Sequence, residues 1–414
     1  MIELRPEQIE ARDKALKALN TLGMVYLAME VRTGKTLTSL SVVHEMSLSA
    51  ALFVTKKKAI PSVESDYRKS GYQFELDVTN FESLHKVYRK YPIYIIDEAH
   101  CLGALGKPNK RTKQLQELIG KGYVILMSGT PTPETFSQIY HQFSISPLSP
   151  FYEYPNFYKW AKRYVSVYKR FVNGYQINQY DRINKDNQKI LEEILDPYMV
   201  RLSQKDAGFE MMVEEKVHYV KMDWKIDQLV KILTKELVYR FKNGEDTLIA
   251  DTPVRLQSYV HQIFSGTVKV SDDKRVILDK SKAYYIKKQF AGKKIAIFYK
   301  FIAEGDMLRS VFPNHTDSPE EFNNNDDMIF IGQVVSNREG TNLSSADYLI
   351  MFNIDFSATS YFQARARMQT KNRTKAATLI WLFALGGIES KIYEAVSRKK
   401  NYTLRYFKKD YGIK

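Results

Sequence analysis

Three segments in the first third of the chain carry residue types suited to phosphate chemistry. Residues 31–36 read VRTGKT, residues 93–100 read IYIIDEAH and residues 124–134 read VILMSGTPTPE. Each lies at or just after a short apolar run of the kind that forms a buried strand. Residues at the ends of such strands line the ligand sites of open α/β sheets. The order and spacing of the three segments therefore predict an ATP-driven motor.

The Gly-Lys-Thr predicts a phosphate-binding loop that enters a helix. Backbone N–H groups at a helix N-terminus hold phosphate oxygens, and Thr33 and Gly34 would supply part of that loop. Lys35 is expected to reach the β and γ phosphates, and Thr36 to ligand Mg²⁺. The match to GxxxxGK[ST] is imperfect because Met29 occupies the first glycine position. An ordinary loop that enters a helix is the alternative for this segment taken alone.

The acidic pair Asp97 and Glu98 strengthens the nucleotide interpretation. Carboxylates directly after an apolar run are costly unless they meet a cation. Asp97 is expected to hold Mg²⁺, and Glu98 to orient or deprotonate the attacking water. A solvated acidic turn is the alternative. His100 either couples this site to the next motif or caps a local turn.

The small hydroxyl residues of the third segment predict a relay. Ser128 and Thr130 follow an apolar run, and their side chains could bond to the acidic loop and transmit the nucleotide state to a second domain. A simple strand-to-helix turn has the same appearance. The prediction therefore depends on the other two segments.

The composition indicates a globular protein with a polyanionic partner. The 414 residues carry a formal charge of +15, from 62 Lys and Arg against 47 Asp and Glu, which favours nucleic acid. No apolar run has the 18 or more residues of a spanning helix, and no signal peptide is evident, so no membrane role is expected. Cys101 is the only cysteine, which predicts a reducing, cytoplasmic location.

Two series of apolar runs predict two α/β domains with parallel sheets. The expected strands of the first domain lie within residues 24–29, 49–55, 93–97 and 123–128, and those of the second within 293–301, 327–335, 347–353 and 378–385. The first domain is predicted at residues 1–145 and the second at 276–414. Residues 146–275 contain an aromatic stretch and longer helical patterns, and they predict a mostly helical insertion and linker.

Several further motifs resemble those of superfamily 2 helicases and translocases, within them the Swi/Snf-like branch. LRPEQ (4–8) is similar to the adenine-recognition motif, which implies that Gln8, with Arg5 beside it, contacts the base. MEVRTGKT is similar to the phosphate loop DEMGLGKT, with Arg32 in place of a glycine. PYMVRLSQKDAG (197–208) and VRLQSYVHQIFSG (254–266) resemble segments that distinguish this branch. The resemblance extends from about residue 4 to 411 and implies two RecA-like domains that bind ATP and Mg²⁺.

Motifs V and VI in the second domain complete the implied nucleotide site. EGTNLSSAD (339–347) resembles motif V and implies that Gly340 contacts the nucleotide. YFQARARMQTK (361–371) resembles motif VI and implies that Gln363 couples the site and that Arg367 is the finger arginine. The usual second arginine falls on Thr370, and Arg365 is the alternate finger. Two helix cations that bind DNA phosphate are the alternative for the arginine pair.

The resemblance also implies contacts with a DNA backbone. These are predicted at Thr55, Lys56, Lys57, Thr79, Asn80 and Thr341. For the lysines, a solvated loop is the alternative. The aromatic, basic stretch at 151–180 could stack on bases, but the packed core of the insertion is the favoured interpretation.

The resulting hypothesis is a nucleic-acid-stimulated ATPase that translocates on or remodels DNA, with duplex DNA favoured. One alternative is a nucleotide-gated DNA clamp that hydrolyses ATP poorly, suggested by the missing glycines and the altered motif VI. Another is an RNA helicase. We expect a monomer from a bacterium or a bacteriophage, acting in the cytoplasm of the bacterial or infected cell.

Overall fold

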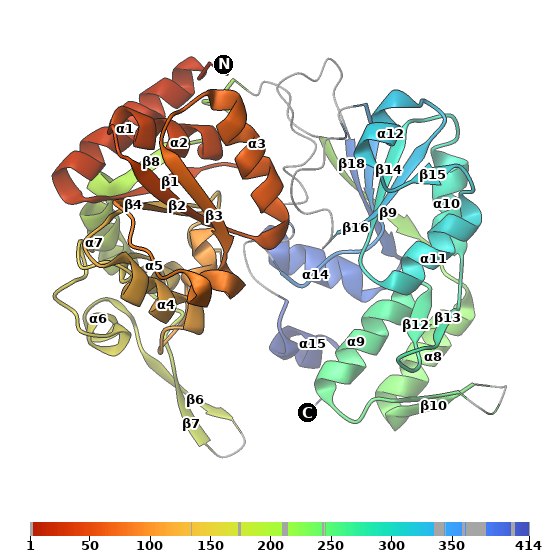
Figure 1. Cartoon of the computed structure of the whole chain (residues 1–414). Helices are drawn as coiled ribbons and strands as arrows, with labels where there is room; N and C mark the ends of the chain where they lie inside the picture. The colour runs from red at the N-terminus through yellow and green to blue at the C-terminus, as the bar shows by residue number, and fades with distance from the viewer. Residues whose placement is uncertain are drawn as a thin grey trace. The chain divides into compact units, whose positions relative to one another are not determined.

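The computed structural model of this chain divides it into two compact units. The described residues are 3–133, 135–172, 175–208, 214–241, 244, 246–334, 343, 345–357, 361, 378–398 and 402–413. Unit 1 is Met1–Phe209 and unit 2 is Glu210–Lys414, and the described part of each contains one six-stranded parallel sheet (Figure 1). The predicted α/β architecture with two RecA-like domains is confirmed.

The sheet of unit 1 has the strand order β3-β2-β4-β5-β1-β8, and every neighbouring pair is parallel. Its strands are β1 (Met24–Met29), β2 (Ala50–Thr55), β3 (Glu75–Asn80), β4 (Ile93–Ile96), β5 (Tyr123–Met127) and β8 (Met199–Leu202). The four strands predicted in the first domain are confirmed as β1, β2, β4 and β5. Their near-continuous apolar sequences reflect burial on both faces.

Helices cover both faces of this sheet. One face packs against α1 (Pro6–Leu22), α2 (Lys35–Glu45) and α3 (Ile60–Ser70). The other packs against α4 (Lys110–Ile119), α5 (Ile139–Phe143), α6 (Phe157–Tyr164) and α7 (Lys185–Leu195). Short 3₁₀ helices lie between these elements: η1 (Lys57–Ala59), η2 (Phe81–Lys86), η3 (Ala99–Leu102), η4 (Phe136–Gln138) and η5 (Asp196–Tyr198). Side chains alternate between the two cores, so Val25 belongs to one and Tyr26 to the other.

The sheet of unit 2 is also parallel, in the order β15-β16-β14-β17-β18-β9. Its strands are β9 (Glu214–Val220), β14 (Ile295–Tyr299), β15 (His315–Thr316), β16 (Ile329–Gln333), β17 (Tyr348–Met351) and β18 (Thr378–Ala384). The four strands predicted in the second domain are confirmed as β14, β16, β17 and β18.

Two helical layers enclose this second sheet. One core is shared with α10 (Ser281–Gln289) and α11 (Ile302–Val311). The other is shared with α8 (Trp224–Glu236), α9 (Pro253–Phe264), α12 (Pro319–Asn324), α14 (Ile388–Ser397) and α15 (Leu404–Asp410). No helix among the described residues is long and apolar enough to cross a membrane.

The structure differs from the predicted separate segment at 146–275. Residues up to Phe209 belong to unit 1 and those from Glu210 to unit 2, because β8 extends the first sheet and β9 the second. The segment also holds three antiparallel pairs: β6 (Tyr168–Val172) with β7 (Tyr175–Gln179), β10 (Val238–Arg240) with β11 (Thr247–Ile249), and β12 (Thr267–Lys269) with β13 (Arg275–Ile277). Strand pairing between distant segments has no local sequence signal, which explains why β8 and β9 were not predicted.

A fully buried ion pair links two helices of unit 2. Lys282 on α10 and Glu389 on α14 are both 0% exposed, and Nζ lies 3.1 Å from Oε1. Lys282 Nζ also donates to the carbonyl of Phe352 at 2.9 Å. Burial raises the pKa of Glu389, and the Lys282 charge opposes that rise. Each charge therefore depends on the other to remain buried.

We expect Lys282→Ala to destabilise the chain by about 3 to 5 kcal/mol, because it leaves the Glu389 carboxylate buried without a partner. Thermal unfolding measures the effect, with Lys288→Ala on the exposed face of α10 as the control. The double variant Lys282→Met with Glu389→Leu should recover much of the loss. A melting temperature equal to that of the control would show that the pair contributes no stability.

Candidate functional site

The phosphate loop connects the end of β1 with the start of α2. Gly34 precedes α2 with a φ of 92°, a left-handed conformation that glycine adopts without strain. Lys35 Nζ donates to the carbonyls of Met29 at 3.0 Å and Glu30 at 3.1 Å. Burial lowers the pKa of Lys35, while the nearby charges of Asp97, Glu98 and Glu30 act in the opposite direction. The loop thus holds a desolvated ammonium beside the acidic pair.

The N-terminal motif packs onto this loop. Arg5 donates to the carbonyl of Thr33 at 2.9 Å, and Gln8 Nε2 lies 3.4 Å from the carbonyl of Gly34. Gln8 Oε1 accepts from the Arg5 backbone N–H at 2.9 Å and from its side-chain Nε at 3.2 Å. A Cβ on Gly34 would lie 1.8 Å from Gln8 Nε2. The structure therefore brings Arg5 and Gln8 to the phosphate loop, and the adenine contact of Gln8 remains a prediction.

Asp97 follows β4 and is held in place by two hydrogen bonds. Thr55 Oγ1 donates to its Oδ2 at 2.8 Å, and the backbone N–H of Glu98 donates to its Oδ1 at 2.9 Å. Burial and the adjacent Glu98 charge raise the pKa of Asp97 to about 6. A carboxylate that is costly to ionise and fixed in orientation is suited to a divalent cation, whose charge would offset the burial.

Glu98 has a different environment from its neighbour. Its backbone is left-handed, with a φ of 50°. Burial opposes its ionisation, but His100 Nδ1 at 3.1 Å and Lys56 Nζ at 3.9 Å outweigh that effect and lower its pKa to about 2. The two adjacent carboxyls thus have pKa values moved apart by their surroundings, as in sites where they serve different roles.

His100 connects this acid to the third motif. The same Nδ1 that faces Glu98 lies 3.0 Å from Ser128 Oγ, and Ser128 Oγ accepts from the Thr130 backbone N–H at 3.1 Å. Ser128 is fully buried. The structure therefore joins Glu98, His100, Ser128 and Thr130 in one chain of polar contacts, as the coupling prediction requires. Their role in catalysis stays a prediction.

Two of the predicted DNA contacts have other partners. Thr55 is 0% exposed and its hydroxyl donates to Asp97, so it is a support of the acidic pair and not a surface contact. Asn80 is largely buried, and its side chain accepts from the Ser83 backbone N–H at 3.0 Å, capping η2. Lys56 is partly exposed but lies near Glu98, while Lys57 is exposed. Thr79 is half-buried at the end of β3.

The predicted residues of motifs V and VI cannot be placed. Gly340, Thr341, Gln363, Arg365 and Arg367 lie outside the residues that the structure describes. The motif-based predictions for these residues therefore remain as the sequence states them.

Sequence reasoning missed a second group of residues around the phosphate loop. Glu30 and Gln204 bond to each other, and Tyr26 donates to Gln142 Oε1 at 2.7 Å, while Gln142 Nε2 donates to the carbonyl of Pro131 at 2.7 Å. Gln142 thereby holds the loop of the third motif from α5. Gln204 lies in the segment 197–208, which resembles a motif of the Swi/Snf-like branch. That resemblance assigned no contact to Gln204.

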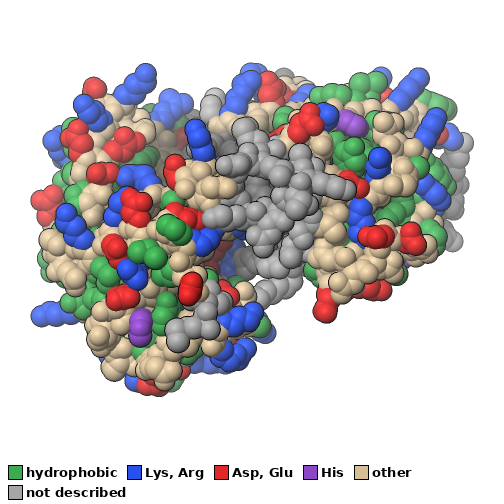
Figure 2. All heavy atoms as spheres, turned by 90° about the horizontal axis from the view of Figure 1, so that it is seen from above, with side chains coloured by type: hydrophobic (Ala, Val, Ile, Leu, Met, Phe, Trp, Pro, Cys, Tyr) green, Lys and Arg blue, Asp and Glu red, His purple; other side chains and the backbone are tan. Residues whose placement is uncertain are grey.

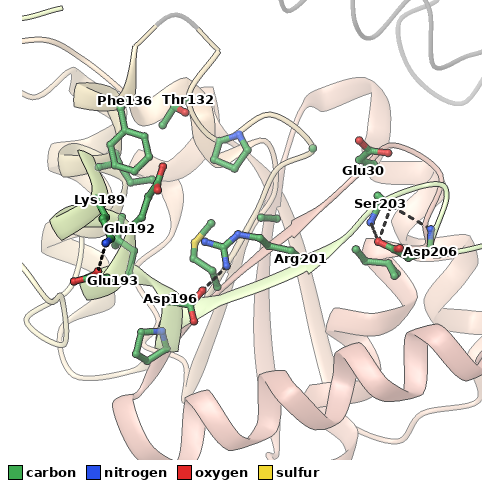
Figure 3. Close-up of a pocket in the computed structure, with 18 residues that line it drawn as sticks. Glu30, Thr132, Phe136, Lys189, Glu192, Glu193, Asp196, Arg201, Ser203 and Asp206 are labelled. Carbon is green, nitrogen blue, oxygen red and sulfur yellow. Dashed lines mark hydrogen bonds and ion pairs between the residues drawn. The ribbon is translucent and has the colours of Figure 1, made fainter. Parts of the chain in front are cut away.

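A cavity of about 910 Å³ lies on this side of unit 1 (Figure 3). Glu30 and the residues Ser203 and Asp206 border one side of it, and Phe136 and Thr132 border the other (Figure 3). Arg201 and Asp196 form an ion pair of 2.7 Å in its wall. The cavity therefore adjoins both the phosphate loop and the loop of the third motif.

The residues present fit a magnesium nucleotide. Gly34 leaves room that a side chain would fill, Lys35 supplies a desolvated positive charge, and the buried Asp97 gains from a cation. Thr36, in the first turn of α2, would be the second metal ligand from the chain.

The raised pKa of Asp97 predicts a pH dependence of ATP hydrolysis. Below about pH 6 the carboxyl is protonated and cannot ligand a cation, so kcat/KM at fixed Mg²⁺ should fall about tenfold per pH unit below that value. Because the pKa is raised by folding, the ionised form destabilises the native state, and Asp97→Asn should raise the melting temperature at pH 8 while it weakens activity. An activity that is flat from pH 5 to 8 would contradict this assignment.

The sequence is similar to a known family model and to two known proteins. The model of the SNF2-related domain matches residues 68–267. The chain is 22% identical over 393 residues to a chromodomain-helicase-DNA-binding protein 1-like of Danio rerio, covering 86% of this chain and 36% of that protein. It is 21% identical over 378 residues to the CHD3-type chromatin-remodeling factor CHR7 of Arabidopsis thaliana, covering 81% of this chain and 29% of that protein.

The chain therefore spans about a third of the length of these relatives. A solved structure of a Sulfolobus solfataricus SWI2/SNF2 ATPase core in complex with dsDNA is 18% identical, with 96% of this chain and 91% of that chain covered and a TM-score of 0.44. The family-model match and the relatives confirm the resemblance inferred from the motifs. Residues 68–267 match the SNF2-related domain, and the chain is similar to the Swi/Snf-like proteins of superfamily 2.

Proposed function

We propose that this protein is a nucleic-acid-stimulated ATPase that uses ATP hydrolysis to move on or remodel duplex DNA. The observation that carries the proposal is the cluster of Lys35, Asp97, Glu98 and His100 at the carboxyl end of the first sheet, in a chain with an SNF2-related domain. Translocation, strand separation and remodelling are all possible outputs of such a motor, and translocation on duplex DNA is the one we propose.

ATP bound with Mg²⁺ would supply the phosphoryl group that passes to water. Lys35 would hold the phosphate oxygens, and Thr55 would keep Asp97 oriented toward the metal. Glu98, with a pKa of about 2, is a weak base. We therefore assign it the role of orienting the attacking water more than of removing its proton. An arginine from motif VI, Arg367 or Arg365, would neutralise the developing charge.

His100 would transmit the state of Glu98 to the loop of the third motif. Its imidazole faces both Glu98 and Ser128, so a change in the hydrogen bonding of Glu98 alters the partner available to Ser128. The Thr130 backbone and the buried pair Tyr26 and Gln142 hold the same loop. Because these residues share one hydrogen-bond network, a new partner for Glu98 would change the hydrogen bonding of the third-motif loop as well.

The positive net charge of the chain and the names of its relatives support DNA as the partner. The chain carries an excess of 15 positive charges, and on the face shown in Figure 2 Lys and Arg side chains are interspersed with acids. Exposed basic side chains also lie on α6 of unit 1. Phe157, Trp160 and Tyr164 are buried against the core, so the aromatic stretch packs as the favoured interpretation predicts.

The opposite face of α6 carries three cations. Lys159, Lys162 and Arg163 are exposed at helical spacings of three and four residues, which places them on one side. Among the residues that the structure describes, no acidic side chain forms a salt bridge with any of these three cations. We propose that this face, hereafter the α6 basic face, contacts DNA phosphates.

Glu98→Gln should reduce ATP turnover by about 10² or more while ATP still binds, because the amide cannot orient water as the carboxylate does. Phosphate release is measured with duplex DNA, single-stranded DNA and RNA, and duplex DNA should stimulate the wild type most. Equal turnover by Glu98→Gln, or no stimulated turnover by the wild type, would favour the clamp. Stimulation by RNA alone would favour the RNA helicase.

Replacing the three cations of the α6 basic face with alanine should weaken DNA binding and lower the slope of log affinity against log salt by about 2 to 3. DNA-free ATP turnover should not change, because α6 holds none of the proposed catalytic side chains. The matched control replaces three exposed lysines on α8, Lys225, Lys231 and Lys235, with the same change in charge. Equal slopes for the two triple variants would exclude the α6 basic face as a specific contact.

A further inference from the structure

The phosphate loop contains a non-glycine residue in a conformation that disfavours it. Arg32 has a φ of 66° at the position where the resembling motif has glycine. A side chain in the left-handed region costs roughly 1 to 2 kcal/mol for residues other than Gly, Asn and Asp. Some interaction elsewhere must therefore keep the loop in this form.

The segment that follows β8 makes that interaction. Gln204 Nε2 donates to the carbonyl of Val31, the residue before Arg32, at 2.9 Å. The Gln204 backbone N–H donates to Glu30 Oε2 at 2.7 Å, and the Glu30 N–H donates to the carbonyl of Leu202 at 2.9 Å. These three bonds attach both residues that precede Arg32 to one short segment.

Gln204 is itself fixed in place. Ser203 Oγ donates to Asp206 Oδ2 at 2.6 Å, and the Asp206 backbone N–H donates to Ser203 Oγ at 3.1 Å. This turn borders the cavity beside Glu30 (Figure 3). Gln204 is only 9% exposed, so its side-chain amide is largely shielded from solvent. Its side chain is therefore oriented before any ligand binds.

The loop also fixes the proposed phosphate-binding groups. The Glu30 carbonyl accepts from Lys35 Nζ at 3.1 Å and from Thr33 Oγ1 at 2.8 Å. A shift of Glu30 or Val31 would thus move the acceptors that orient Lys35. Gln204 therefore acts on the Lys35 ammonium indirectly, because it bonds to Glu30 and Val31, and the Glu30 carbonyl accepts from Lys35 Nζ.

We propose that Gln204 is a positioning residue that holds the phosphate loop in its binding form despite the left-handed Arg32. The inference rests on the proposed nucleotide function but assigns a role that the motifs do not. It explains how this chain retains the loop without the usual glycine. If so, nucleotide binding should no longer depend on Gln204 when residue 32 is one that adopts a left-handed backbone easily, such as Gly or Asn.

The test is a double-mutant cycle between positions 204 and 32 in the full-length chain. Gln204→Ala removes only the bond to Val31, because its backbone N–H still bonds to Glu30. We expect faster hydrogen exchange of the peptide covering residues 29–36 without nucleotide, and an ATP Kd about 3- to 10-fold higher. Combined with Arg32→Gly or Arg32→Asn, the same substitution should change the Kd by less than about twofold.

Arg32→Ala is the matched control, since it removes the arginine side chain but keeps the left-handed penalty. Gln204→Ala should remain as damaging in that background as in the wild type. Lys205→Ala, at the exposed neighbouring position, should change neither readout. Rescue by Arg32→Ala equal to that by Arg32→Gly would show that the arginine side chain, not the backbone, is responsible.

Equal effects of Gln204→Ala in all backgrounds would overturn the proposal. The exchange measurement needs neither ATP nor DNA, so it reports on the loop even if the motor function is wrong. Conversely, normal DNA-stimulated hydrolysis with additive effects in the cycle would reject the role of Gln204 alone.

Discussion

The desolvated charges at the carboxyl end of β1 and β4 are the constraint on which unit 1 depends. Lys35, Asp97 and Glu98 lose much of their hydration there, and burial acts against the charged form of each. The fold supplies partial compensation through Thr55, His100 and Lys56. The remaining cost of burying these charges is greatest at Asp97, and a bound magnesium nucleotide would reduce that cost.

The supports of this cluster come from elements far apart in the sequence. The N-terminal motif reaches the phosphate loop through Arg5 and Gln8, and the end of unit 1 reaches it through Gln204. β1 lies between β5 and β8, which come from the middle and the end of the unit's sequence. The strand β8 is also the last strand before the boundary with unit 2.

Buried polar contacts have a similar structural role in unit 2. Besides the pair of Lys282 and Glu389, the buried Glu304 carboxylate accepts from the Asn353 side chain at 2.6 Å, and His261 Nε2 lies 2.5 Å from Asn353 Oδ1. Asn353 follows β17, Glu304 lies on α11 and His261 on α9, so these contacts join the end of β17 to two helices. Because a buried polar group is costly without a partner, these contacts favour one arrangement of the helices at the end of β17.

The sequence by itself determined the alternation of strands and helices and the eight central strands, and it singled out Lys35, Asp97 and Glu98, which the fold brings together. Apolar runs buried on both faces identify central strands, and Gly-Lys-Thr and Asp-Glu are recognisable locally because their chemistry depends on adjacent residues. The edge strands β8 and β9, the division of residues 146–275 between the units and the contact of Thr55 with Asp97 were decided by tertiary structure. So were the contacts of Gln204 with Glu30 and Val31. Such contacts join residues separated by more than 170 positions, and their energies depend on burial and distance, which one-dimensional spacing does not specify.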